Sequence, residues 1–427
     1  MKNLLLFLLV IITVCTVNAQ ETWEVQRYKD IDPVKDICFV GSHGWAVGQN
    51  MVYYSSDYGN KWLSQNPQSN VRFYSVSFTG LQNGWAVGAA GNIINTTDAG
   101  KHWQVDNKGA NLVFSSVFFI DEMNGWIVGR NDVKHEAVVL KTINGGKNWN
   151  ETTIGSAKEI PDKVFFINKQ TGWITANFPP TIYRTTDAGF TWEYTKIPVQ
   201  EVLHSIYFIN DKEGWACGGY YDRINGSRSL LLKTVDGGVT WQILSDKYLY
   251  QLTDIHFINN KAGFCIGYAP AVGCGLVSAL VLKTTDGGMH WIRNDISQNL
   301  FLSNIFIDDG HNAWIVGENN FGKGGILHAA ISMETNIKER DDAMQVILTP
   351  NPATDYIEIA INNHGMGNTN PTLKDAVVVY DVLGNVALTL TPDLSLNGEG
   401  VKVGVSGLVK GVYFVRVGDK MYKFVKM

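Results

Sequence analysis

The sequence is poor in charge and has no block of basic residues. Lysine and arginine number 35 and aspartate and glutamate 40, which gives a formal net charge of -5 over 427 residues. Nucleic-acid-binding proteins usually carry a concentrated basic surface, so we expect no nucleic-acid partner. The chain also has no Walker loop, no Ser-His-Asp elbow and no metal-binding motif, so we expect neither a metal nor a cofactor.

Long apolar runs are equally scarce. The stretch MKNLLLFLLVIITVCTVNAQ at the N-terminus has one lysine, an apolar run from Leu4 to Val17 and small residues before Ala19. This is the layout of a secretory signal peptide, over residues 1–19. A membrane anchor is the alternative, but the run is too short to span a bilayer comfortably. We expect cleavage near Ala19, no transmembrane segment, and export.

Cysteine is rare, with five residues, of which Cys15 leaves with the signal peptide. The exported chain keeps four: Cys38, Cys217, Cys265 and Cys274. In an oxidising compartment four cysteines allow three pairings, which the sequence leaves open. Cys265 and Cys274 are close in sequence and are the first candidates for a bridge. The spacing fits no zinc site.

Aromatic residues and glycine are abundant, with 13 Trp, 17 Tyr and 43 Gly, and many of them belong to a repeat. Seven copies of a glycine–aromatic strand recur 40 to 50 residues apart: GWAVG at Gly44 and Gly84, GWIVG at Gly125, GWITA at Gly172, GWACG at Gly214, GFCIG at Gly263 and AWIVG at Ala313. That period is the length of a four-stranded propeller blade. The repeat predicts an all-β, seven-bladed β-propeller over residues 20–332.

The seventh unit ends at GILHAAIS and lacks the fourth strand that begins with a Trp in the other six. A matching segment, ETWEVQRY with Trp23, stands at the start of the exported chain. We expect this N-terminal strand to complete the last blade, because an open ring would leave two exposed sheet edges.

An octet such as TTDGGMHW, Thr284 to Trp291, precedes the fourth strand of six units. Its fifth residue is always Gly and its eighth always Trp, and its third is a short acid or amide that bonds its own turn. A device present once per blade is structural rather than catalytic. The third residues are Asp57, Asp98, Asn144, Asp187, Asp236 and Asp286.

These octets resemble Asp-box repeats, also called bacterial neuraminidase repeats. Together with the GWAVG strands, they make residues 21–332 similar to the propeller family of the photosystem II assembly and stability factor. Members of that family bind a partner protein and are not enzymes, so the resemblance implies a binding role. Fold-level similarity is weak evidence about function, because related repeats serve many unrelated secreted proteins.

The repeat ends before a polar linker, residues 333–345, and residues 346–427 form a different module. Alternating strands separated by Gly and Asn turns predict a small antiparallel β-sandwich. Pro350-Asn351-Pro352, VYDVLG at Val379–Gly384, LVKGVYFVRV at Leu408–Val417 and the ending YKFVKM resemble the type A sorting domain of the type IX secretion system of Bacteroidetes. The resemblance implies that residues 346–427 contact that secretion machinery and direct the protein to the cell surface or beyond it.

Binding residues are expected on the face opposite the octets, where the loops between second and third strands are long in blades three, five, six and seven. Blades five to seven are adjacent, so their loops would form one raised sector suited to a protein or glycan ligand. Tolerated insertions are the alternative explanation. The candidate ligand-binding residues are Tyr220, Tyr221, Asp222, Arg223, Tyr268 and Phe321.

The central channel is the other candidate site. A ring of polar residues stands at the first position of each inner strand: Asp36, Ser75, Ser116, Lys163, Ser205, Asp254 and Asn304. Asp36 and Asp254 are a weak candidate for the carboxylate pair of a secreted, polysaccharide-degrading glycoside hydrolase. We expect instead an exported, non-enzymatic propeller with no catalytic residue, and leave the hydrolase as the alternative.

Overall fold

The computed structural model describes residues 22–28, 31–155, 158–222, 226–245, 250–270, 277–296, 299–308, 312–331, 345–349, 356–362, 377–380, 386–390, 401–404, 407–417 and 420–426. The chain divides into two compact units, Met1–Thr335 and Asn336–Met427. The described residues contain no helix that is long and apolar enough to cross a membrane.

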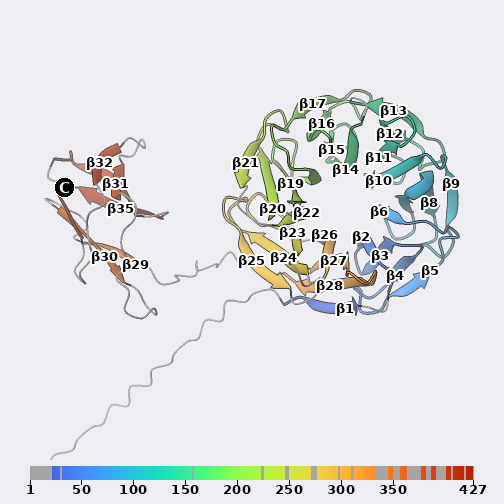
Figure 1. The fold of residues 1–427 in the computed structure, drawn as a ribbon, viewed down its shortest axis with the longest axis horizontal. Coiled ribbons are helices and arrows are strands. Elements are labelled where there is room, and N and C mark those ends of the chain that lie inside the picture. Colours follow the sequence, from blue (N-terminus) through green and yellow to red (C-terminus); the bar gives the residue numbers. More distant parts are fainter. Residues whose placement is uncertain are drawn as a thin grey trace, which may run out of the picture. The chain divides into compact units, whose positions relative to one another are not determined.

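The first unit is a ring of seven four-stranded antiparallel sheets, as the repeat predicts (Figure 1). Blade one contains β2 (Val34–Val40), β3 (His43–Gly48), β4 (Val52–Ser55) and β5 (Leu63–Gln65). Blade two contains β6 (Phe73–Phe78), β7 (Gly84–Gly88), the 3-10 helix η1 (Ala89–Gly91), β8 (Asn92–Thr96) and β9 (Gln104–Asn107). Blade three contains β10 (Leu112–Phe119), β11 (Gly125–Asn131), β12 (Glu136–Thr142) and β13 (Asn150–Ile154).

The remaining blades follow the same order, with the inner strand first. Blade four contains β14 (Ile160–Phe166), β15 (Gly172–Asn177), β16 (Thr181–Thr185) and β17 (Glu193–Lys196). Blade five contains β18 (Leu203–Phe208), β19 (Gly214–Asp222), β20 (Gly226–Thr234) and β21 (Gln242–Ser245). Blade six contains β22 (Gln251–Phe257), β23 (Gly263–Pro270), β24 (Val277–Thr284) and β25 (Ile292–Ile296). Blade seven contains β26 (Phe301–Ile307), β27 (Asn312–Glu318), β28 (Gly324–Ala330) and, from the N-terminus, β1 (Glu24–Tyr28).

The ring is closed by the N-terminal strand, which confirms the prediction drawn from the seventh unit. Strand β1 pairs antiparallel with β28, with Glu24 opposite His328, and Figure 1 shows the blue β1 beside the orange β28. Trp23 packs against the apolar cluster between blades six and seven. The outer strand of the last blade therefore comes from the opposite end of the propeller sequence.

The tryptophans of the repeated GW strands hold neighbouring blades together. The Trp45 ring stacks on Phe78 of the next blade with centroids 3.7 Å apart, and Trp45 Nε1 donates to the carbonyl oxygen of Ala99 at 3.1 Å. Five further joints repeat this stack at 3.5 to 3.8 Å: Trp85–Phe119, Trp126–Phe166, Trp173–Phe208, Trp215–Phe257 and Trp314–Phe39. Between blades six and seven, Phe264 has no N–H to donate and packs in an apolar cluster with Ile307.

The octets form turns in which the first residue matters as much as the third. The Thr96 hydroxyl donates to Asp98 Oδ1 at 2.9 Å and accepts the N–H of Gly100 at 2.9 Å. Asp98 Oδ1 also accepts the N–H of His102 at 2.9 Å. The other five octets make the same three bonds. The sequence identified the acid and the Gly but missed the role of this buried hydroxyl.

Acid is expected to weaken these turns. Hydrogen bonds lower the pKa to about 2 for Asp98, through the His102 N–H, and likewise for Asp187 and Asp236, through Thr191 and Thr240. The pKa of each carboxyl is lower in the folded chain than the ordinary value of about 4. The stability that these carboxylates contribute is therefore fully present above about pH 4 and falls as pH drops toward 2. Replacing all three by Asn should flatten this fall in urea-unfolding midpoints, since Asn144 already serves in one octet. An unchanged acid dependence in that variant would contradict the assignment.

The C-terminal unit contains two antiparallel sheets, in agreement with the predicted small β fold. One sheet has the order β29 (Gln345–Thr349), β30 (Tyr356–Asn362), β33 (Val401–Gly404). The other has the order β32 (Val386–Leu390), β31 (Val377–Tyr380), β34 (Gly411–Val417), β35 (Lys420–Lys426).

The expected bridge between Cys265 and Cys274 is wrong, because Cys265 is a free thiol. Cys265 is buried between blades five and six, in the same apolar cluster as Cys217. Five residues of β23, about 17 Å of extended chain, separate it from the end of the strand, beyond which Cys274 lies outside the described residues. Cys38 and Cys217 are also free. Burial raises the pKa of Cys217, and Cys265 beside it raises that pKa further.

Candidate functional site

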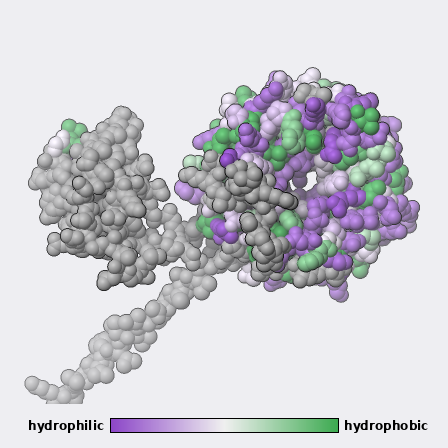
Figure 2. Space-filling model, viewed as in Figure 1, coloured by the Kyte–Doolittle hydropathy of each residue, from purple (hydrophilic) through white to green (hydrophobic). Residues whose placement is uncertain are grey.

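One hollow of the propeller is a basin at one mouth of the central channel. Its volume is about 560 Å³, and it is lined by the starts of the inner strands together with the ends of the second strands. The octet turns lie at the other face, where the N–H of Ala99 and its equivalents bonds the turn between the first and second strands. Figure 2 shows the opening in the ring with hydrophilic residues around it. We refer to this hollow as the basin.

A β-bulge at the same place in every inner strand gives the basin its lining. The register shifts by one residue at each site, and the bulged residue lines the hollow in all seven blades, with its successor beside it in every blade but the fifth. The bulged residues are Lys35, Tyr74, Ser115, Asp162, His204, Thr253 and Ser303. Sequence reasoning missed this second ring. The available signal is a pair of successive polar residues, such as Lys35-Asp36, that breaks the strand alternation.

The ring of polar residues expected at the channel joins adjacent blades. Asp36 Oδ2 accepts the N–H of Val76 in blade two at 2.8 Å, and Asp254 Oδ2 accepts the N–H of Ile305 in blade seven at 2.9 Å. Ser75 and Ser116 accept backbone N–H groups of the following blade in the same way. The Ser205 hydroxyl donates to Asp254 Oδ1. Both candidate catalytic carboxylates are therefore engaged as structural acceptors.

Lys163 supplies a positive charge to the polar ring, which also contains the carboxylates of Asp36 and Asp254. Its burial lowers its pKa, but the charges of Asp254 and Asp36 outweigh that effect, so that its pKa is raised overall. Burial raises the pKa of Asp36, against the opposing effects of Lys163 and the Val76 N–H. The two carboxylates thus share one cation in the channel. We call Asp36, Lys163 and Asp254 the channel triad.

Aromatic side chains line the channel beyond the triad. A second hollow of about 240 Å³ is bordered by a ring two residues further along the inner strands: Cys38, Ser77, Phe118, Phe165, Tyr207, His256 and Phe306. The Tyr207 and His256 rings lie 4.3 Å apart. Burial, and then the charge of Lys163, lower the pKa of His256 to about 3, so this side chain is neutral at pH 7.

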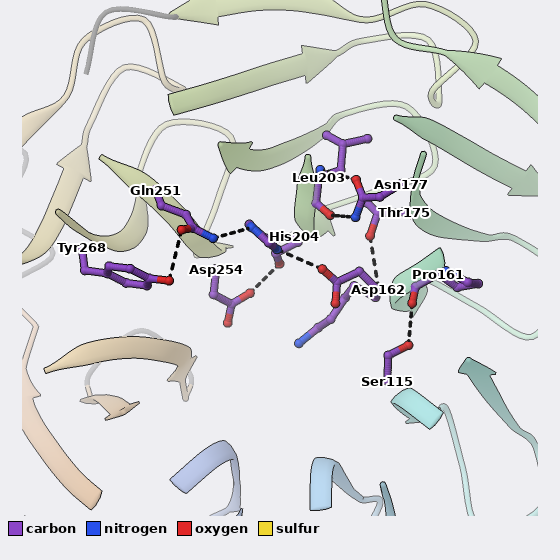
Figure 3. A network of polar contacts seen from close by, with 12 residues as sticks. Ser115, Pro161, Asp162, Thr175, Asn177, Leu203, His204, Gln251, Asp254 and Tyr268 are labelled. Carbon is purple, nitrogen blue, oxygen red and sulfur yellow. Dashed lines mark hydrogen bonds and ion pairs between the residues drawn. The ribbon is translucent and has the colours of Figure 1, made fainter. Parts of the chain in front are cut away.

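One wall of the basin carries a chain of hydrogen bonds across three blades (Figure 3). The Tyr268 hydroxyl donates to Gln251 Oε1 at 3.1 Å, and Gln251 Nε2 lies 3.0 Å from His204 Nε2. His204 Nδ1 lies 2.9 Å from Asp162 Oδ2. With the proton on Nδ1, a neutral His204 donates to the carboxylate and accepts from the Gln251 amide. Both ring nitrogens are then occupied, so His204 is not placed to act as a base.

The rim of the basin carries paired charges. Lys35 Nζ lies 2.6 Å from Glu318 Oε1, and Arg130 Nε lies 2.5 Å from Asp132 Oδ1. Pairing of this kind makes the rim polar without giving it a strong charge of one sign.

Of the six binding residues expected from the loops, Tyr268 lines the basin, with its ring edge-on to Phe301 at 4.9 Å. Tyr220 is half-buried in β19 and Phe321 is 88% exposed in the β27–β28 loop, and neither borders the basin. Tyr221 and Asp222 lie in β19 with side chains outside the description, and Arg223 lies outside the described residues. The long loops of blades five and six are extensions of the β19–β20 and β23–β24 hairpins.

The described residues include no cluster of three or more His, Cys, Asp or Glu side chains suited to hold a metal ion.

Comparison with known proteins gives two family matches. Residues 15–112, 105–197 and 190–301 match the family described as photosynthesis system II assembly factor YCF48. Residues 348–427 match the secretion system C-terminal sorting domain. No curated protein sequence shows significant similarity to the chain.

Solved structures with the same fold include both binding proteins and enzymes. A structure titled "YCF48 bound to D1 peptide" is 20% identical, with a TM-score of 0.56 over 73% of this chain and 97% of its own. YCF48 from Cyanidioschyzon merolae is 18% identical, with a TM-score of 0.56 over 72% and 98%. The GH74 xyloglucanase from Xanthomonas campestris is 11% identical, with a TM-score of 0.55 over 81% and 60%.

At these identities the structures show a shared fold and no shared activity. The family match has more weight, because it runs from residue 15 to residue 301 and therefore covers more than half of the chain. The chain accordingly belongs to the photosynthesis system II assembly factor YCF48 family and ends in a secretion system C-terminal sorting domain.

Proposed function

We infer that the chain is an exported, non-catalytic binding protein whose basin holds an extended segment of a partner protein. The observation that carries this inference is the basin itself, a polar hollow of about 560 Å³ lined by all seven blades through their bulged inner strands. Such a hollow offers side-chain and backbone partners on every side and an aromatic wall at Tyr268 and Phe301. A relative titled as bound to the D1 peptide supports a peptide ligand.

The channel triad favours binding over hydrolysis. A glycosidase needs one carboxyl group that gives a proton and one carboxylate that attacks or activates water. Asp36 and Asp254 instead accept backbone N–H groups at 2.8 and 2.9 Å, and their charges raise the pKa of the Lys163 that lies between them in the channel. The triad therefore stabilises the ring.

Site-specific crosslinking tests the proposal. A benzoylphenylalanine at position 268 should crosslink to one peptide segment of a surface or secreted protein, whereas the same residue at position 321, exposed but outside the basin, should not. Equal crosslinking at both positions, or none at position 268, would contradict it. Hydrolysis of a polysaccharide panel that is lost in Asp254→Asn would favour the alternative, a glycoside hydrolase.

Export is proposed from the sorting domain at residues 348–427 and from the signal peptide predicted over residues 1–19. The domain would contact type IX secretion machinery and send the propeller to the cell surface or the medium. A chain that ends at residue 345 should remain in the periplasm in cell fractions. Its normal delivery to the surface would refute the sorting role.

A further inference from the structure

A second hollow, of about 410 Å³, lies at the outer edge of the propeller between blades three and four. One wall is β13, with Thr152 to Ile154, and the other is β16 and β17 with the octet of blade four. Glu159, which is buried, stands between them before β14. We call this hollow the edge pocket. It is separate from the basin, because the two share no lining residue.

The residue three positions after the Trp differs between the joints: it is Gln26 and Gln65 in two, Thr152 here, and Asp106, Thr195, Leu244 and Asn294 in the others. At the equivalent position in two other joints, Gln26 and Gln65 fill the groove. Gln65 donates to the carbonyl oxygen of Ala99 at 3.2 Å and accepts from Trp103 Nε1 at 3.4 Å. Gln26 bonds Tyr58 and Trp62 in the same way. Thr152 takes this position in blade three and is too short to reach, since its hydroxyl bonds Val139 of its own sheet.

The short side chain leaves an indole N–H without a partner. Trp192 lines the edge pocket, and its Nε1 is buried and has no hydrogen-bond partner among the described residues. Trp149 and Trp241 also lack a partner within the described part of the chain, so an unpaired indole alone does not mark a site. The feature that distinguishes this joint is a group of exposed aromatic side chains beside Trp192.

Aromatic residues gather at the edge pocket where the other blades have none. Phe190 is 73% exposed and Tyr194 is 60% exposed, and both border the hollow. The residues equivalent to Phe190 are Asn60, Lys101, Lys147, Val239 and Met289, and those equivalent to Tyr194 are Ser64, Val105, Glu151, Ile243 and Arg293. Exposed aromatic rings grouped at one hollow, and absent from the equivalent positions of the other blades, point to an interaction site.

The side chains that line the edge pocket carry no net charge, because Glu159 and Lys196 balance. The Tyr183 hydroxyl donates to Glu159 Oε2, and burial followed by this bond raises the pKa of Tyr183. Lys196 Nζ borders the pocket and lies 5.9 Å from the Tyr194 ring centroid. Lys141 Nζ lies 3.7 Å from the Phe190 ring centroid and covers it from blade three. The lining thus carries one carboxylate and one ammonium group, with the Lys141 ammonium nearby, which disfavours a cationic ligand such as a methylated amine.

We propose that the edge pocket binds a neutral oligosaccharide. Pyranose rings present apolar C–H faces that pack on aromatic rings, here Tyr194, Phe190 and Trp192, and hydroxyl groups that both donate and accept. Glu159 accepts from sugar hydroxyls, and Thr153 and Lys196 supply donors. Gly155 keeps the floor open, because a Cβ there would lie 2.1 Å from the Tyr183 hydroxyl oxygen and 2.5 Å from Glu159 Oε2.

Titration of the full chain with cellohexaose, xylohexaose, mannohexaose, chitohexaose and maltohexaose, followed by calorimetry, tests the proposal. At least one should bind, and Phe190→Ala with Tyr194→Ala should weaken that sugar at least about tenfold. The matched control is Val239→Ala with Ile243→Ala, the same two positions in blade five, which should leave affinity unchanged. Binding that survives the first pair of substitutions, or no binding to any of the five sugars, would overturn the proposal. Crosslinking at position 268 reports on the basin independently.

Discussion

A chain without residues 20–28 is expected to lose most of the thermal stability of its propeller. The deletion removes β1, so that β28 becomes an unpaired edge, and it removes Trp23 from the cluster between blades six and seven. Trp23 is partly buried, and its loss together with the β1–β28 ladder costs at least about 3 kcal/mol. At about 2 to 4 °C per kcal/mol for a large domain, the melting temperature should fall by at least about 6 °C.

The loss of β1 should destabilise the propeller by more than the lost packing of Trp23 alone, because β1 lies at a joint that is already weak. Blade six meets blade seven without a GW tryptophan, since Phe264 has no N–H that could bond the next blade. Strand β1 lies beside this weaker joint. An exposed β28 edge is also a template for pairing with another chain, so aggregation should accompany unfolding.

Differential scanning calorimetry with a complementing peptide separates closure from general damage. A synthetic peptide of residues 20–31 added to the truncated chain should restore much of the melting temperature, because it supplies the missing strand. A peptide with Trp23 replaced by Ala should restore less. An unchanged melting temperature in the truncated chain would show that the ring does not depend on β1.

The repeat made the ring predictable from sequence because each blade is one local unit with its own turn. The position of Trp23 followed from the same logic, since only the strand missing from the seventh unit needed a source. The free state of Cys265 could not be predicted, because its proximity to Cys274 in sequence says nothing about where the strand directs its side chain. Cys265 and Cys217 face each other across blades, a contact between residues far apart in the chain.

The functional surfaces were less accessible to sequence reasoning. Long loops drew attention to Phe321 and Tyr220, but the basin depends on bulges that add His204 and Asp162 to its wall. A one-residue bulge shifts a side chain from the sheet interior to the channel without changing the apolar pattern around it. The edge pocket was hidden for a different reason. Thr152 becomes informative only when Gln26 and Gln65 are seen to fill the same groove elsewhere.

Replacing Lys163 by Met is expected to destabilise the propeller by about 3 to 5 kcal/mol at pH 7, because it leaves buried carboxylates without their cation. Asp36 and Asp254 are each less than 10% exposed and each bonds the next blade. Repulsion between them would therefore strain two blade joints at once. Lys35→Met is the matched control, since its pair with Glu318 is partly exposed at the rim and should contribute less than about 1 kcal/mol.

Neutralising the whole triad should recover most of the loss. In Asp36→Asn, Lys163→Met, Asp254→Asn, each amide oxygen still accepts its backbone N–H, and no uncompensated charge remains. The pH dependence gives a second check on Lys163→Met alone. Without the cation the pKa of Asp36, already raised, rises further, so the folded chain binds a proton that the unfolded chain has released. The stability lost in Lys163→Met relative to the unaltered chain should therefore shrink as pH falls from 7 toward 5 and grow again as pH rises. Chemical denaturation at both pH values measures it, and a deficit that does not change with pH would mean that Lys163 contributes packing rather than charge.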